Sequence, residues 1–224
     1  MTFNINDREY LRVLAEQCAR TYTQKPAIEA DGVELLIEED NHDNLVVAFR
    51  GTTFDGLDII RDIRALPWWS TSLQTWCHRG FLKGAASIFG PLLRELNLED
   101  ALPGAPSGSR PGYILTGHSK GGAEATLVAA ALVRAGCPPR ALVTFGAPLA
   151  GGSGLRRWLR NVSGHRVMNR GDPIPSVPWL LGKTGVFQHH RGATGIDTSL
   201  NGVWGGPHNH KIGHYIDALG YTSV

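Results

Sequence analysis

The chain has 224 residues, 42% of them hydrophobic and 19% charged, which predicts one globular domain over 1–224 with a substantial core. Its formal net charge is only +2 and no basic block occurs, so nothing favours nucleic acid as a partner. The three cysteines have no close pairs, which argues against a disulfide framework and against a Cys-x-x-Cys metal site.

The sequence carries no recognisable targeting segment. The first residues, MTFNINDREYLRVL, lack a basic stretch followed by an apolar run, so we expect no signal peptide. No apolar run reaches the length of a membrane span. We therefore expect a cytoplasmic chain, or one secreted by a route without a recognisable leader.

Apolar runs alternate with helix-like segments along the chain. Asn6 is the expected N-cap of the first helix, because Glu9 three residues later fits a capping box. In chain order we predict a helix over 6–22, strands over 33–40 and 44–51, a helix over 78–96, a strand over 112–117, a helix to about residue 134, a strand over 141–148, a strand running into a loop over 165–175, a further strand over 185–192 and a closing helix over 210–220. This alternation predicts an α/β fold, with a mainly parallel central sheet covered by helices on both faces.

The stretch GHSKG places Ser119 in a Gly-x-Ser-x-Gly motif between an apolar strand and an Ala-rich helix. Glycines suit a sharp strand-to-helix turn, where side chains at the flanking positions would collide. The start of the helix beside the serine favours the negative charge of an acyl-transfer intermediate. The alternative is a glycine-rich turn with a capping serine, but the context favours a nucleophile.

Seven blocks in order give the chain a resemblance to the class 3 lipases, the fungal-type triacylglycerol lipases and their bacterial relatives of the α/β-hydrolase superfamily. The resemblance extends from about residue 33 to 220. The blocks are VVAFRGTT, DIIRDI, CHRGFLKG, LTGHSKGGAEATLVA, VTFGAPLAG, NRGDPIPSVP and HNHKIGHYIDAL. The resemblance implies an α/β-hydrolase fold and ester hydrolysis by a serine, an acid and a histidine.

The base that activates Ser119 is not one of its neighbours, because adjacent side chains at a tight turn diverge. A Ser-x-x-Lys arrangement is excluded because position 122 is glycine. The triad order of this fold places the histidine after the acid. His210, five residues before a tyrosine, fits the family's terminal block, with His208 and His214 as competitors.

The expected acid is Asp172, which follows an apolar strand and precedes prolines that stiffen its loop. It would fix the tautomer of the histidine and stabilise the imidazolium. Asp197 is the fallback acid, without a comparable block around it. The expected oxyanion donors are the backbone N–H of Lys120 and, by resemblance, the N–H and hydroxyl of Thr52.

The chemistry needs no cofactor and no metal. His189 and His190 are adjacent, and neighbours on a strand point to opposite faces, so we expect no metal site there. The Lys120 side chain is unusual, because apolar residues are common at that position in the family.

Apolar side chains flanking these loops suggest a hydrophobic acyl site. The candidates are Phe54, Leu57, Trp68, Trp69, Trp179 and Leu180. The segment 53–76 occupies the family's lid region, so we expect an amphipathic cover that opens in a transient contact at a lipid–water interface.

The sequence therefore predicts a hydrolase of carboxylic esters, acting on acylglycerols or simple acyl esters through an acyl-serine. A phospholipase, a feruloyl-type esterase or an acyltransferase would use the same residues with a different pocket. A non-catalytic binding module of the same fold is the alternative from another class. The sequence leaves the oligomeric state undetermined.

Overall fold

A seven-stranded sheet forms the centre of the computed structural model, which describes residues 4–52, 66–98, 112–192, 194–196 and 207–220. The strand order is β1-β2-β3-β6-β7-β8-β9. The bounds are Ile28–Ala30, Val33–Glu39, Asn44–Phe49, Gly112–His118, Ala141–Phe145, Ser163–Asn169 and Thr194–Ile196. From β3 to β9 all neighbours are parallel, and β1, β2 and β3 pair antiparallel at one edge.

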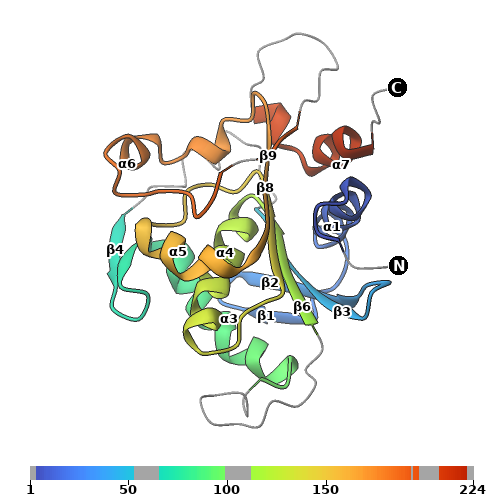
Figure 1. Ribbon diagram of the computed structural model, residues 1–224, viewed down its shortest axis with the longest axis horizontal. Coiled ribbons are helices and arrows are strands. Elements are labelled where there is room, and N and C mark those ends of the chain that lie inside the picture. Colours follow the sequence, from blue (N-terminus) through green and yellow to red (C-terminus); the bar gives the residue numbers. More distant parts are fainter. Residues whose placement is uncertain (1–3, 53–65, 99–111, 193, 197–206, 221–224) are drawn as a thin grey trace.

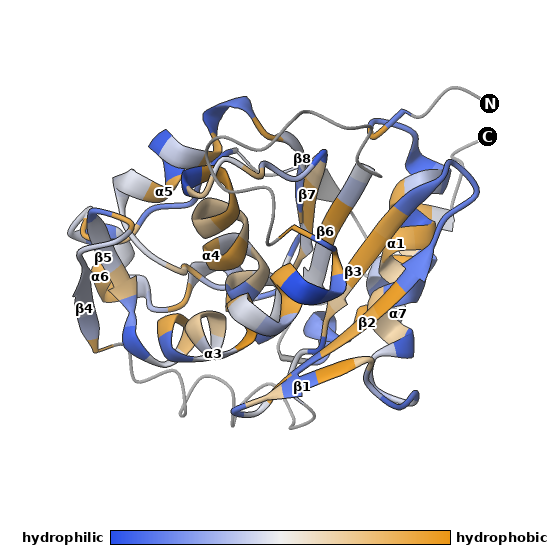
Figure 2. Cartoon of the chain, turned by 90° about the horizontal axis from the view of Figure 1, so that it is seen from below, coloured by the Kyte–Doolittle hydropathy of each residue, from blue (hydrophilic) through white to orange (hydrophobic). Residues whose placement is uncertain are grey.

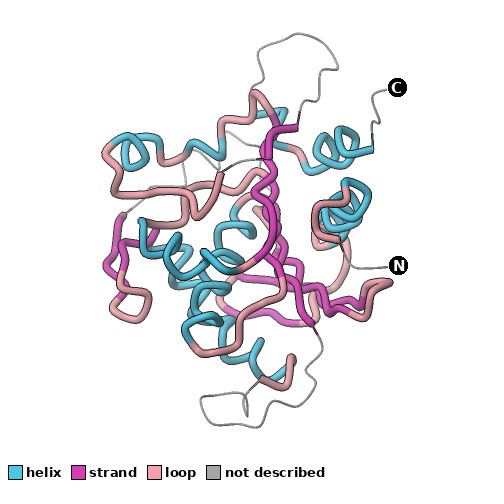
Figure 3. The backbone as a smooth tube through the Cα atoms, in the orientation of Figure 1, coloured by secondary structure: helices cyan, strands magenta, loops and turns pink. Residues whose placement is uncertain are grey.

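Helices cover both faces of this sheet, in two separate groups (Figure 1). One face carries α1, Arg8–Arg20, and α7, Ile212–Gly220, which pack against each other although they lie at opposite ends of the chain. The other carries α3, Arg79–Glu95, α4, Lys120–Arg134, and α5, Ser153–Trp158. The smooth trace shows the strands running between these groups (Figure 3).

The parallel strands are apolar because both of their faces are buried. In β3, Val46 packs with the α1 and α7 core, whereas Val47 packs with the α3 and α4 core. Ile114 and Leu115 of β6 divide in the same way. Alternate residues of a strand point to opposite faces, so a continuous apolar run supplies both cores. Figure 2 shows this hydrophobic colouring along β2 and β3.

The remaining described elements are short and lie outside the seven-stranded sheet. A two-stranded antiparallel hairpin consists of β4, Pro67–Ser70, and β5, Thr75–His78. The helix α6 spans Trp179–Lys183. Three 3-10 turns complete the described part: η2, Leu159–Asn161, η3, Ile174–Ser176, and η4, Pro207–His210. The sequence analysis predicted neither the hairpin nor α6.

Two local predictions are wrong. The first helix starts later than expected, because the Asp7 side chain, and not that of Asn6, accepts a bond from Glu9 N and forms the cap. Residues 185–192 form a loop, and the edge strand is Thr194–Ile196, which pairs with β8. Within the described residues, no helix is long and apolar enough to cross a membrane.

The first turn of α4 allows no side chain at Gly121. A Cβ there would lie 2.3 Å from the Phe49 carbonyl oxygen and 2.7 Å from the Arg50 carbonyl oxygen. These are backbone atoms at the end of β3, so relief would require the strand to move away from the helix.

We expect Gly121→Ala to lower the free energy of unfolding in urea by about 2 kcal/mol or more, as overpacking does. The control is Gly213→Ala in α7, where an added Cβ meets nothing within 4 Å. It should leave stability unchanged or raise it by up to about 1 kcal/mol. Equal losses in both variants would contradict the role assigned to the close approach.

Candidate active site

Ser119 lies at the sharp turn between β6 and α4, with φ 56° and ψ −130°. A positive φ is strained for a residue with a side chain and persists only where surrounding contacts hold it. Here the Ser119 N–H donates to Phe145 O at 2.9 Å, and a Cβ on Gly117 would lie 2.6 Å from backbone atoms of Gly121. The Gly-x-Ser-x-Gly pattern therefore reflects close backbone packing at this turn.

The end of β3 lies directly against Ser119. A Cβ on Gly51 would lie 3.3 Å from Ser119 Cβ and 2.7 Å from His118 O. Gly51, Thr52 and Lys120 share the lining of one cavity of about 230 Å³. The first N–H groups of a helix have no acceptor within it, and Lys120 is the first residue of α4. The first turn of α4 therefore leaves the Lys120 N–H without an acceptor inside the helix.

His210 ends η4 just before α7, and its ring contacts the expected acid. His210 Nδ1 lies 2.7 Å from Asp172 Oδ2, in a buried pair. The same Oδ2 accepts from the Tyr215 hydroxyl at 2.5 Å, and Oδ1 accepts from Ile174 N at 2.9 Å. Because a carboxylate only accepts, Nδ1 carries a proton, and in the neutral imidazole Nε2 carries the lone pair.

Tyr215 supports this arrangement from α7. Burial and the neighbouring charge of Asp172 raise the pKa of the Tyr215 phenol well above its usual value, so it stays a donor. Its oxygen also accepts from Asn169 N at 3.3 Å. The buried Asp172 carboxylate therefore accepts three hydrogen bonds, from His210, Tyr215 and Ile174. A buried charge needs such partners because it has lost its contact with water.

The proposed nucleophile and base are among nine buried side-chain atoms of the described residues that have no hydrogen-bond partner. They are Ser119 Oγ and His210 Nε2, and both are buried. A serine hydroxyl can act as a nucleophile and a histidine nitrogen as its base. The Asp172 carboxylate already orients this histidine. No hydrogen bond joins Ser119 Oγ to His210 Nε2 in the described structure, and catalytic hydrogen bonds often tighten only when substrate binds.

The other histidines considered as bases differ from His210. His118 uses both ring nitrogens, bonding the Tyr22 hydroxyl at 2.8 Å and the His210 carbonyl at 2.7 Å. His208 is exposed and His214 half-buried, and their rings lie against each other, with centroids 4.7 Å apart. The fallback acid Asp197 lies outside the described residues. Only His210 among these histidines contacts Asp172 in the described structure.

The Lys120 side chain is held away from the serine. Its Nζ lies 2.9 Å from Glu124 Oε1 and donates to Gly32 O at 3.1 Å, in the turn between β1 and β2. Glu124 is fully buried, and burial raises the pKa of its carboxyl to about 7 although Lys120 opposes this shift. Through these two contacts the Lys120 ammonium links the first turn of α4 to the β1–β2 turn at the edge of the sheet.

This carboxyl should make stability depend on pH. Folding raises the pKa of Glu124 from 4.5 to about 7, so the folded chain keeps a proton that the unfolded chain releases. Rising pH across that window therefore favours unfolding. Glu124→Gln removes the titrating group. We expect the wild type to lose stability relative to this variant between these two pKa values, measured by urea unfolding in a buffer series. A constant difference across the series would contradict the raised pKa.

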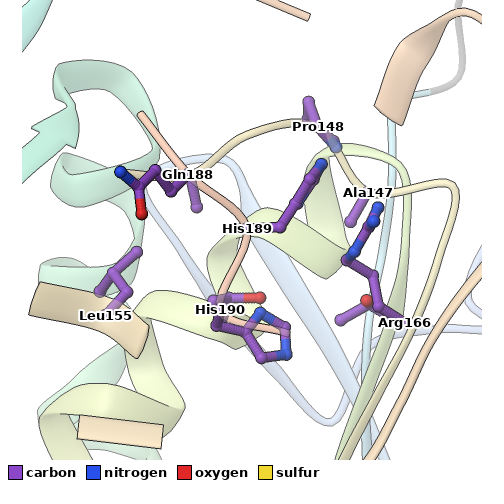
Figure 4. Close-up of a pocket in the computed structure, with 10 residues that line it drawn as sticks. Ala147, Pro148, Leu155, Arg166, Gln188, His189 and His190 are labelled. Carbon is purple, nitrogen blue, oxygen red and sulfur yellow. The ribbon is translucent and has the colours of Figure 1, made fainter. Parts of the chain in front are cut away.

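His189 and His190 lie in a loop, so the expectation of opposite faces on a strand is wrong (Figure 4). His189 Nε2 bonds Pro175 O at 2.7 Å. Burial, together with nearby arginines, lowers the pKa of His189 to about 4 and that of His190 to about 3. Both line a cavity of about 10 Å³, and the described residues contain no group of three metal-ligating side chains.

Four of the residues expected at the acyl site lie on the surface. Trp68 and Trp69 on β4 are 54% and 46% exposed, and Trp179 and Leu180 on α6 are 56% and 60% exposed. None of them lines a described cavity. The remaining candidates, Phe54 and Leu57, lie outside the described residues, as does most of the expected cover over 53–76.

The sequence analysis missed three supporting side chains. Tyr215 entered it only through its spacing to His210, and Tyr22 only as the last residue of the predicted first helix. Glu124 was not considered, although its position four residues after Lys120 is a recognisable signal for an ion pair on a helix.

The fold and the site together define a class of protein: an α/β hydrolase with its serine at a strand-to-helix elbow. Solved structures of known proteins have a similar fold. A triacylglyceride lipase structure from Rhizomucor miehei has TM-score 0.64 at 20% identity, covering 87% of this chain and 80% of that one. A lipase structure from Rhizopus microsporus var. chinensis has TM-score 0.64 at 19% identity, covering 91% and 78%. These structures confirm the predicted fold.

Sequence comparison identifies the family. The profile of the class 3 lipases matches residues 46–181, so the chain belongs to the class 3 lipase family. Secreted mono- and diacylglycerol lipase 1 of Fusarium solani is 32% identical over 107 residues, which are 46% of this chain. That match spans 30% of the length of the fungal protein.

Proposed function

We propose that the chain hydrolyses carboxylic esters, either acylglycerols or simple acyl esters, through an acyl-serine on Ser119. Membership of the class 3 lipase family supports this reaction class. The observation that carries the proposal is the buried His210, with Nδ1 bonded to Asp172 and Nε2 without a partner in the described structure. No cofactor takes part in this chemistry.

In the acylation step, Ser119 Oγ attacks the ester carbonyl carbon while His210 Nε2 takes the hydroxyl proton. Asp172 stabilises the imidazolium that forms. The carbonyl oxygen becomes an oxyanion, which receives hydrogen bonds from the Lys120 N–H and from Thr52. The tetrahedral intermediate then collapses, and His210 returns the proton to the departing alcohol.

In the deacylation step, a water molecule takes the place of the alcohol. His210 removes one of its protons as the water oxygen attacks the acyl-serine carbonyl. The second tetrahedral intermediate breaks its bond to Ser119 Oγ, which recovers the proton, and the carboxylic acid leaves. The same donors serve both steps.

A series of p-nitrophenyl esters with two to sixteen carbons tests this assignment. Ser119→Ala and His210→Ala should lose nearly all turnover, and Asp172→Asn should lose about 10³- to 10⁴-fold in kcat because the histidine takes the wrong tautomer. The two competing histidines supply matched controls, so His208→Ala and His214→Ala should keep most activity. Loss at either control with retention at His210→Ala would overturn the choice of base.

We also propose that the protein meets lipid through one aromatic surface, defined as Leu66, Trp68, Trp69, Trp76, Trp179 and Leu180. These are the exposed large hydrophobic side chains of the described residues. They lie on or beside the hairpin and on α6, which Figures 1 and 2 both place at the same end of the molecule. Arg79 lies over the Trp68 ring at 5.1 Å and Lys183 over the Trp179 ring at 4.9 Å. Tryptophan with flanking cations suits a lipid–water interface.

Trp69 and Trp76 pack edge to face, with ring centroids 5.6 Å apart, and this pair allows a direct test. Changing both to alanine should weaken co-sedimentation with phosphatidylcholine–phosphatidylglycerol vesicles about tenfold or more, because apolar burial is lost. The ratio of turnover on an emulsified ester to turnover on a soluble short ester should fall with it. An unchanged ratio together with unchanged sedimentation would rule this surface out.

A further inference from the structure

His118 is a buried histidine next to the nucleophile that the proposed reaction does not use. Its two ring nitrogens contact two different parts of the chain. Nδ1 lies 2.8 Å from the Tyr22 hydroxyl, and Nε2 lies 2.7 Å from the backbone carbonyl of His210. The His118 and His210 rings lie close together, with centroids 4.6 Å apart.

We propose that His118, held by the Tyr22 hydroxyl, is a positioning residue that fixes the main chain of His210 through its carbonyl. This inference rests on the proposed function, because it assigns a role relative to the base of that reaction. Neither His118 nor Tyr22 touches substrate or exchanges a proton with it.

The hydrogen-bond types determine the tautomer of His118. A carbonyl oxygen only accepts, so Nε2 must carry the proton and donate it to His210 O. Nδ1 then holds a lone pair and accepts from the Tyr22 hydroxyl. Each ring nitrogen has one partner of the right kind, so Tyr22 selects the tautomer that can hold the His210 carbonyl.

The charge of His118 fits this role. Burial and the proximity of His210 lower the pKa of His118 well below its usual value, although its bond to the His210 backbone opposes the shift. The ring is therefore neutral when His210 becomes an imidazolium during acylation. A protonated ring at that separation would repel the cation that Asp172 stabilises.

Tyr22 connects this pair to the oxyanion side of the site. A Cβ on Gly51 would lie 2.2 Å from the Tyr22 hydroxyl oxygen. Burial raises the pKa of the Tyr22 phenol, and a backbone hydrogen bond from Gly51 opposes that shift. One hydroxyl thus contacts the residue before Thr52 and the residue before Ser119. Through His118 it also reaches the base.

The base needs such a support, because His210 lies in a short 3-10 turn and not in regular structure. The preceding carbonyl, that of Asn209, accepts from Asn169 Nδ2 at 3.1 Å. The carbonyl of His210 itself accepts from His118. Without this bond the imidazole could shift along the Asp172 carboxylate, and an error of about 1 Å in a reacting group costs about 10²-fold in rate.

Four variants of the intact chain test the proposal. Tyr22→Phe removes only the hydroxyl, His118→Phe keeps a ring without donors, and His118→Gln restores an N–H near the Nε2 position. Tyr10→Phe is the matched control, because it removes a buried hydroxyl from α1 that bonds Asp40 and lies outside the site. All are assayed on a soluble p-nitrophenyl ester, well below the melting temperature of each variant.

We expect kcat to fall about tenfold or more in Tyr22→Phe and further in His118→Phe, with KM within about twofold. His118→Gln should recover most of the loss, and Tyr10→Phe should keep wild-type kcat at a comparable drop in melting temperature. Wild-type kcat in Tyr22→Phe and His118→Phe, or no recovery in His118→Gln, would overturn the proposal.

A second measurement separates this inference from the proposed function. The long-range ¹H–¹⁵N spectrum of the histidine rings, recorded on the wild type, should show His118 as the neutral Nε2–H tautomer from about pH 5 to 8. An Nδ1–H tautomer or a titrating ring would refute the positioning role even in an active enzyme. An inactive wild type with the expected tautomer would instead refute the hydrolase assignment.

Discussion

The left-handed backbone of Ser119 is the constraint on which the rest of the site depends. It turns the chain from β6 into α4 within one residue, at the carboxyl end of β6. A backbone of this kind costs about 1–3 kcal/mol and needs contacts that hold it. The contacts leave no room for side chains: Gly117 and Gly121 pack against backbone atoms, and Gly122 against the Ala147 Cβ and the Gly117 carbonyl. The ends of β3 and β7 close around the turn.

The same packing brings the other groups to one edge. In a parallel sheet the carboxyl ends of the strands lie together, and ligands bind outside them. Gly51 and Thr52 follow β3, Ser119 follows β6 and Asp172 follows β8. His210 joins them from the other end of the chain, because α7 packs against α1 beneath the sheet. Tyr215 and His118 fix the acid and the base from that buried side.

The amino-acid sequence predicted the parts of this structure that rest on local patterns. Apolar runs identified β6 and β7, because strands buried on both faces need apolar residues throughout. The position of Ser119 could be predicted because its sharp turn requires glycines on both sides. That of Asp172 could be predicted because it follows an apolar strand. The exposure of Trp68 could not be predicted, because an aromatic strand residue has the same pattern whether it faces the core or the solvent. No periodicity reveals that the Tyr22 hydroxyl meets His118, since that contact depends on tertiary packing.

Covalent labelling with a fluorophosphonate tests the central claim, that Ser119 is a nucleophile activated by His210 and Asp172. The reagent reacts with a serine only where a base removes its proton, and peptide mapping by mass spectrometry locates the adduct. The arrangement predicts one adduct per folded chain, on Ser119, and none after unfolding in urea. The absence of an adduct in the folded protein, or an adduct on another residue with Ser119 unmodified, would contradict it.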